Sequence, residues 1–481
     1  IFWGRPNIFR PNRVLRSRTN TGYFALESLG MSSILILGAK LVNEGTIEEK
    51  DVLVDATGRI SRIESDLSAA IADETIDAAG HYLLPGLIDD QVHFREPGLT
   101  HKGTIQSESK AAVAGGITSF MEMPNTLPNV LTNELLEEKY QRASQTSWAN
   151  YSFFMGISKD NLEVALRIDN ERVCGITDDG LYFHNDEGIL ANYPEFLETL
   201  FSRSESLIAL HSEDDAIIHA NKKFYTQKFG ADIPCEYHSK IRPTEACVQA
   251  TKRVLELAEK HQNRLHLFHI STKEEADLLA KYAGDIRSKR ITAEACVHHL
   301  FFNEEDYAQL GNRIKWNPSI KSAADNHGLL KALNEDILDI IATDHAPHAW
   351  EEKTGTYDQA KSGGPLVQEA LLALFEFYHR GQLTLEKIVQ KTSHHVAEIY
   401  RIPDRGYIRE GYFADLVLVD LQQETTVTAA NLNYTCGWSP FEGRTFRSRI
   451  EHTFVNGNLV YSQDKAQEFS AGSRLTFEKN R

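Results

Sequence analysis

The sequence predicts an α/β protein: a (β/α)8 barrel of the TIM type, with a small β-sandwich domain built from both chain ends. Apolar strand-like runs alternate with helical stretches over residues 83–405, and a stretch of about 320 residues suits a barrel better than an open sheet. Short β-rich runs fill residues 31–82 and return in residues 406–481. Polar residues also follow several strand-like runs, as expected at the top face of a barrel.

The two end regions have the sequence pattern of a small β-domain. Their β-rich runs are bounded by Gly or acidic turns, which separate strands. Asn456-Gly457 follows the last run and is typical of a two-residue hairpin turn. We therefore expect one domain that is discontinuous in sequence. The runs are residues 34–37, 51–54, 59–63, 415–420 and 452–455.

The central region supplies the barrel strands and helices. The predicted strands are residues 117–120, 207–210, 265–268 and 338–342, and the predicted helices are residues 110–114, 246–260 and 366–378. His93, His211, His269 and Asp344 each lie at or near the end of a strand-like run. Because strand ends converge at one face of a barrel, we expect these four side chains to meet there.

Composition narrows the classes of function. The chain has 481 residues and a formal net charge of −17, which argues against nucleic acid or an anionic membrane as a partner. An acidic small substrate stays open, because a local Arg and a metal can reverse the field inside a pocket. No apolar run is long enough to span a bilayer. The five cysteines form no CxxC pair, the pattern of a reducing compartment, so we expect a cytoplasmic protein.

Residues 1–30 stand apart from the rest of the chain. They hold five arginines, one acidic residue, and no apolar core of a secretion signal. We expect Met31 to be the native start and residues 1–30 to be a disordered or non-native leader. A transit peptide is the alternative, since the segment is rich in Arg and poor in acids.

Three segments carry a resemblance to a known family. Residues 89–98, Asp-Asp-Gln-Val-His-Phe-Arg-Glu-Pro-Gly, resemble the first metal motif of the amidohydrolase superfamily, and the last four narrow the resemblance to dihydroorotases. Residues 123–126, Met-Pro-Asn-Thr, and 342–348, Ala-Thr-Asp-His-Ala-Pro-His, support it. The resemblance implies a hydrolase of de novo pyrimidine biosynthesis. Its reaction is the reversible conversion of L-dihydroorotate and water to N-carbamoyl-L-aspartate.

The resemblance also implies a metal centre. Its ligands would be His93, Asp179, His211, His269 and Asp344, holding one or two Zn²⁺ per chain. Imidazole and carboxylate groups suit zinc, and bound zinc lowers the pKa of its water to about 7. Asp344 resembles the combined ligand and general base, which takes a proton from the water and passes it to the leaving nitrogen. A helix cap is the alternative role for Asp344.

Further residues resemble the family's substrate contacts. Arg95 and Asn125 resemble the pair that holds a substrate carboxylate, and the planar fork of Arg matches a carboxylate. Arg95 lies two residues past His93, so on a strand both would point to one face. The resemblance adds Asn317, His348, Ser362 and Gly363 as substrate-binding residues; ordinary turn residues are the alternative for these.

Two departures leave the metal count open. The family's first motif is His-x-His, but the first position here is Gln91, whose carbonyl is a poor zinc ligand. Many members carry a metal-bridging lysine, and the corresponding segment 175–180 reads Gly-Ile-Thr-Asp-Asp-Gly. It matches dihydroorotases in which the second Asp bridges the metals, so we expect Asp179 in that role and Asp178 as the fallback. A simple Asp-Gly turn is the alternative.

His298-His299 is a tempting metal pair outside these motifs. Adjacent residues on a strand point to opposite faces, so both would not serve one site. We therefore expect them to be structural.

Two other functions remain open at this point. One is a sister cyclic amidohydrolase, such as an allantoinase or a hydantoinase, whose substrates usually lack the carboxylate that Arg95 would bind. The other is a catalytically silent partner of aspartate transcarbamoylase. It stays open because Gln91 replaces a metal-binding histidine of the family and the metal-bridging lysine is absent. Family resemblance also implies a homodimer.

Overall fold

The computed structural model describes residues 32–181, 193–462, 465–466 and 472–479. The leader predicted for residues 1–30 falls outside these ranges. Among the residues that the structure describes, no helix is long and apolar enough to cross a membrane.

Parallel strands form the centre of the fold. They make a six-stranded sheet in the order β14-β13-β12-β11-β10-β9 and a three-stranded sheet in the order β6-β7-β8, and an isolated parallel bridge joins Val92 to His345. Parallel pairing in chain order, with helices between the strands, makes this a TIM-barrel-like α/β fold. The strands are β6 (Leu87–Val92), β7 (Ile117–Glu122), β8 (Asn150–Phe153), β9 (Met155–Gly156), β10 (Ile176–Thr177), β11 (Ile208–Leu210), β12 (Leu265–Leu267), β13 (Ile291–Cys296) and β14 (Ile340–Ala342).

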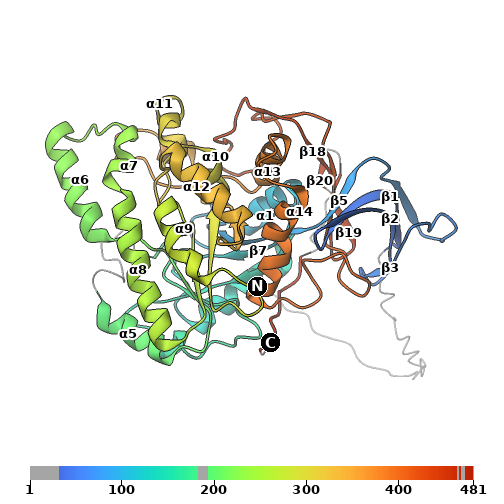
Figure 1. Ribbon diagram of the computed structural model, residues 1–481, viewed down its shortest axis with the longest axis horizontal. Helices are drawn as coiled ribbons and strands as arrows, with labels where there is room; N and C mark the ends of the chain where they lie inside the picture. The colour runs from blue at the N-terminus through green and yellow to red at the C-terminus, as the bar shows by residue number, and fades with distance from the viewer. Residues whose placement is uncertain (1–31, 182–192, 463–464, 467–471, 480–481) are drawn as a thin grey trace, which may run out of the picture. The chain divides into compact units, whose positions relative to one another are not determined.

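Helices follow the strands and lie around them (Figure 1). Several start at side-chain caps: the hydroxyls of Thr104 and Thr132 and the carboxylate of Asp214 accept N–H groups of the first turn. The helices are α1 (Ile105–Ala114), α2 (Asn133–Thr146), α3 (Leu162–Ala165), α5 (Pro194–Arg203), α6 (Asp215–Phe229), α7 (His238–Ile241), α8 (Thr244–His261), α9 (Lys273–Leu279), α10 (Val297–Phe301), α11 (Tyr307–Leu310), α12 (Ala323–Asn334), α13 (Ala370–His379), α14 (Leu385–Val389) and α15 (His395–Tyr400).

Two helix starts were predicted wrongly: α1 begins at Ile105 instead of residue 110, and α13 begins later than expected. The sequence predicts a helix from residue 366, but α13 begins at Ala370. The backbone N–H of Leu366 lies 3.0 Å from Nδ1 of His345, and that of Val367 lies 3.4 Å from the same atom. Both N–H groups thus converge on one imidazole nitrogen, and residues 367–369 form a turn before the helix begins.

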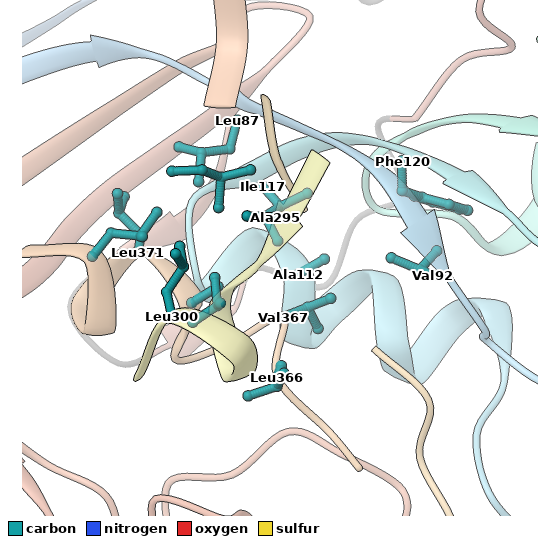
Figure 2. Packing of buried hydrophobic residues seen from close by; sticks show 14 of the residues in the cluster. Leu87, Val92, Ala112, Ile117, Phe120, Ala295, Leu300, Leu366, Val367 and Leu371 are labelled. Atoms are coloured by element: carbon teal, nitrogen blue, oxygen red, sulfur yellow. The ribbon is translucent and has the colours of Figure 1, made fainter. Parts of the chain in front are cut away.

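The main core lies between the parallel strands and their helices. Figure 2 shows Leu87 and Ile117, near the starts of β6 and β7, close to Ala295 of β13, with Leu300 and Leu371 from the helices beside them. β6, β7 and β13 are buried along their whole length. Burial on both faces is expected for parallel strands that helices cover.

Strands from both chain ends form the extra β domain, in one nine-stranded sheet ordered β20-β19-β18-β15-β5-β1-β2-β3, with β4 paired to β1. Antiparallel pairing of β5 with β15 joins the two ends. Asn456 and Gly457 have φ of 51° and 79°, which confirms the predicted hairpin turn. The strands are β1 (Ile34–Asn43), β2 (Thr46–Val54), β3 (Ile60–Glu64), β4 (Glu74–Asp77), β5 (Tyr82–Pro85), β15 (Leu416–Asp420), β18 (Arg449–Val455), β19 (Asn458–Ser462) and β20 (Lys465–Ala466); β16 (Thr425–Thr426) and β17 (Thr445–Phe446) pair separately.

Candidate active site

A cavity of about 240 Å³ lies at the carboxyl ends of the parallel strands. Every site residue predicted from the sequence lines it except His269, which is buried behind the wall. The predicted residues that line it are His93, Arg95, Asn125, Asp179, His211, Asn317, Asp344, His348, Ser362 and Gly363.

Strand ends position the predicted metal residues. His93 and His211 directly follow β6 and β11, and Asp179, His269 and Asp344 each lie two residues past the end of a strand. His269 and Asp344 have φ of 38° and 46°, which few residues with a Cβ adopt. Such backbone strain gathers at functional sites.

Asp179 lies at the centre of the metal residues. Its Oδ1 is 3.8 Å from Nδ1 of His211 and 3.9 Å from Nε2 of His269. One ligand atom from each of these three residues lies within 4.8 Å of the others. Two imidazoles and a carboxylate, all buried, form a donor set that fits a divalent metal such as zinc.

His93 and Asp344 lie on the other side of Asp179. Nε2 of His93 is 3.5 Å from Oδ2 of Asp179 and 3.2 Å from Oδ1 of Asp344. Burial lowers the pKa of His93 to about 4, so its ring is neutral at pH 7. Burial also raises the pKa of the Asp344 carboxyl well above its usual range. The structure thus brings together all five residues predicted as metal ligands.

The fallback residue Asp178 also lines the cavity, but one of its oxygens is engaged with the backbone. Its Oδ1 accepts the backbone N–H of His211 at 3.2 Å. Burial and the neighbouring Asp179 raise its pKa to about 8. Next to it, Gly180 has φ of 71°, and a Cβ there would lie 2.2 Å from Nδ2 of Asn125. Glycine at this position therefore lets Asn125 approach the turn.

Sequence reasoning missed the groups that hold the two histidines. Nε2 of His211 lies 2.9 Å from Oε2 of Glu213, which also pairs with Arg242. Burial opposes the charge on Glu213, but Arg242 and His211 outweigh it and keep the pKa of Glu213 well below its usual range. Oε1 of Glu294 accepts the backbone N–H of His269 at 2.9 Å. Such contacts behind the ligands fix the orientation of the ligands. The one sequence signal that could have indicated them is Glu213, an acidic residue two positions after His211.

The cavity lining also carries a buried cation that suits an anion. Arg95 is 5% exposed and has a φ of 72°; its Nε donates to the carbonyl of Pro347, and its Nη2 lies 3.2 Å from Nε2 of His348. Burial lowers the pKa of Arg95 to about 10, so it stays charged at pH 7. Oδ1 of Asn317 is buried with no hydrogen-bond partner in the described ranges, and Oδ1 of Asn125 lies 2.8 Å from Nδ1 of His93.

Two buried lysines, also missed, hold part of the cavity wall. Nζ of Lys353 donates to the carbonyls of Lys361 and Gly363 at 2.7 and 2.6 Å. Nζ of Lys315 donates to the carbonyls of Tyr357 and Ala360, both at 2.6 Å. These four hydrogen bonds anchor residues 357–363 beside the cavity.

The reasoning applied to His298 and His299 was wrong. It placed them on a strand, with opposite orientations. The chain leaves β13 at Cys296 and enters α10, where both histidines lie with ring centroids 4.0 Å apart. Neighbouring helix residues differ by about 100° rather than 180°. Together with Cys296, these side chains form a second buried group of metal-type donors.

Comparisons with known proteins agree with this geometry. Residues 82–460 match the amidohydrolase family. The dihydroorotase of Staphylococcus epidermidis is 31% identical over 90% of this chain and 100% of its own. That of the Wolbachia strain from Drosophila simulans is 33% identical over 83% and 88%.

Solved structures of hydantoinases share the fold. The L-hydantoinase (dihydropyrimidinase) of Arthrobacter aurescens is 25% identical, with a TM-score of 0.86 over 93% of this chain and 100% of its own. A D-hydantoinase at 21% identity and a TM-score of 0.81 supports the fold alone. The extent of these matches shows that the chain belongs to the amidohydrolase family and, within it, to the dihydroorotases.

Proposed function

We propose that this enzyme opens and closes a cyclic amide: L-dihydroorotate and water to N-carbamoyl-L-aspartate, in pyrimidine biosynthesis. The observation that carries the proposal is the buried guanidinium of Arg95 in the same cavity as the Asp179, His211 and His269 donor set. A fixed cation beside a metal centre suits a ring that bears a carboxylate next to its reacting amide.

The metal would be Zn²⁺, held by Asp179, His211 and His269, with His93 and Asp344 bordering it. When bound, zinc supplies a Lewis acid that polarises the attacking water and the amide carbonyl. Glu213 and Glu294 would keep the two histidines in the orientation that binding requires.

Asp344 would move the proton. It would accept a proton from water as the new C–O bond forms and then give it to the ring nitrogen as the C–N bond breaks, and a cation beside it would keep the carboxyl ionised for the first step. Nε2 of His93, 3.2 Å away, and Nε1 of Trp316, which donates to the Asp344 carbonyl at 3.3 Å, hold it in place.

The loop residues would orient the ring. Arg95 and Asn125 bind the substrate carboxylate. The unpartnered Oδ1 of Asn317 accepts a ring N–H, since a buried acceptor without a partner costs free energy until a ligand satisfies it. His348, which lies 2.9 Å from the Ser362 carbonyl oxygen, supports this wall together with Gly363.

The finer architecture belongs to the same proposal. Residues 83–405 would close into an eight-stranded barrel, and residues 31–82 and 406–481 would form the β-sandwich. A cytoplasmic location, a homodimer and a transcarbamoylase partner remain predictions from the sequence.

Hydantoinase activity is the second candidate, because the L-hydantoinase of Arthrobacter aurescens is so similar in fold. Arg95 argues against it, since a hydantoin ring brings no carboxylate to pair with the buried charge. The test compares the kcat/KM values of the purified zinc-loaded chain for L-dihydroorotate and for a 5-alkylhydantoin. We expect a preference for dihydroorotate of at least about 100-fold. Equal values, or a preference for the hydantoin, would refute the proposal.

A further inference from the structure

Gln91 is a fully buried amide beside the metal donors. Its Nε2 donates to Oδ2 of Asp179 at 3.1 Å, and its Oε1 accepts the thiol hydrogen of Cys296 at 3.5 Å. These two partners decide which amide atom faces which way. In the reverse orientation the amide oxygen of Gln91 would face Oδ2 of Asp179, so two hydrogen-bond acceptors would lie against each other.

The two oxygens of Asp179 therefore face unlike surroundings. Oδ1 faces Nδ1 of His211 and Nε2 of His269, which lie 2.9 Å from each other and can both turn a lone pair to a cation once the proton between them is lost. Oδ2 faces the N–H of Gln91 and Nε2 of His93. A metal-binding position needs lone pairs on every side, and an N–H presents a hydrogen with partial positive charge.

A cation on the Oδ2 side would meet an obstacle in the Gln91 amide. It would have to displace the Gln91 hydrogen from Oδ2, or turn the amide and break its contact with Cys296. Gln91 is 0% exposed, so water could not replace the lost contacts, and a buried polar group left unpaired is costly.

We propose that Gln91 makes this a one-metal active site. A single divalent cation binds on the Oδ1 side, among Asp179, His211 and His269, and the Gln91 amide takes the place of a second cation against Oδ2. Gln91 is then a positioning residue that holds the Asp179 carboxylate with Oδ1 turned toward the cation. This inference rests on the proposed function, because it concerns the metal of the same site.

The test counts zinc on the full chain after dialysis against buffer with excess Zn²⁺ and then against metal-free buffer. Elemental analysis should give about one zinc per chain, and X-ray absorption should show no zinc neighbour at about 3.5–4 Å, the spacing of two-metal sites. In Gln91→His an imidazole replaces the N–H donor, so zinc should rise to about two per chain with that neighbour present.

Two further variants keep the test decisive. Gln91→Glu has nearly the size of Gln91 and offers carboxylate oxygens, so it should also bind a second zinc if the histidine variant does not fold. Cys296→Ser is the matched control, since it keeps the amide of Gln91 and should stay at about one zinc.

Either of two results would overturn the inference: two zinc ions in the unaltered chain, or folded Gln91→His and Gln91→Glu proteins that both stay at one. Metal counts do not depend on turnover. One zinc without dihydroorotate turnover would refute the proposed function alone, and two zinc ions with turnover would refute this inference alone.

Discussion

Two sets of residues at the cavity, which we call the donor end and the anion end, differ in charge and in origin. The donor end has three carboxylates and three histidines that follow strand ends: Asp179, Glu213, Asp344, His93, His211 and, behind the lining, His269. The anion end has the cations Arg95, Lys315 and Lys361, and residues 346–363 supply much of the cavity wall. The cavity thus offers donors for a cation and a buried cation for an anion, so a metal and an acidic substrate can meet in one chamber.

The largest expected effect is at the donor end. Asp344→Asn removes the group that carries the proton, so kcat should fall by at least about 100-fold. Asp358→Asn is the control, because Asp358 lines the same cavity but pairs with Lys222 and is half exposed; its kcat should change little. Steady-state kinetics on dihydroorotate with equal zinc loading measures both. A kcat of Asp344→Asn close to the unaltered value would break the assignment.

The next effect concerns cation binding itself. Zinc that binds only the folded chain should stabilise it by about 4 kcal/mol when free zinc exceeds Kd about 1,000-fold. Asp179→Asn should lose this gain. The adjacent Asp178→Asn should keep it, because Asp178 accepts a backbone N–H instead of facing the donors. Thermal unfolding with and without zinc distinguishes them, and equal shifts in both variants would show that the centre is misplaced.

At the anion end the expected effect is smaller. Arg95→Met removes charge-assisted hydrogen bonds to the substrate carboxylate, each worth about 1.5–3 kcal/mol, so kcat/KM for dihydroorotate should fall about 10- to 100-fold. Lys361→Met also removes a cation from the lining and should cost much less. Unchanged kcat/KM in Arg95→Met would mean that this end binds something else.

The smallest expected effect on catalysis is at Glu369, which belongs to neither end of the cavity and should affect stability instead. Oε1 of Glu369 has no partner within the described part of the chain, and burial raises the pKa of Glu369 to about 8. Because the pKa of the Glu369 carboxyl is higher in the folded chain than its ordinary value of 4.5, this carboxyl stabilises the fold below pH 4.5. The contribution is lost as the pH rises to 8.

The unfolding free energy of the unaltered chain should fall by up to about 4 kcal/mol between pH 4.5 and 8 because of this group, since one pKa unit corresponds to about 1.36 kcal/mol. Glu369→Gln should remove this part of the fall. The exposed Glu256→Gln should leave that slope intact, and neither variant should change kcat. Denaturant unfolding across this pH range measures the slope. The same slope in Glu369→Gln and the unaltered chain would contradict the assigned pKa.

The same comparison explains what could be predicted from the sequence. His93, His211, His269 and Asp344 follow strand-like runs, and barrel strand ends converge whatever the loops do, so this cluster was predictable. Glu294 and Trp316 were not, because they act across long sequence separations on backbone groups of His269 and Asp344.

Loops account for the remaining misses. No periodicity indicates that Lys315 and Lys353 bury their ammonium groups against loop carbonyls. His298 and His299 were misjudged because β13 ends earlier than its apolar pattern suggests. Gln91 was recognised as a departure, but its role depends on the contact with Cys296, which only the fold supplies.

The most direct test measures L-dihydroorotate hydrolysis by the purified chain, with zinc determined on the same sample before and after chelation. We expect turnover with zinc bound, loss of turnover on chelation, and recovery when zinc is restored. A folded, zinc-loaded chain that does not turn over dihydroorotate would contradict the account.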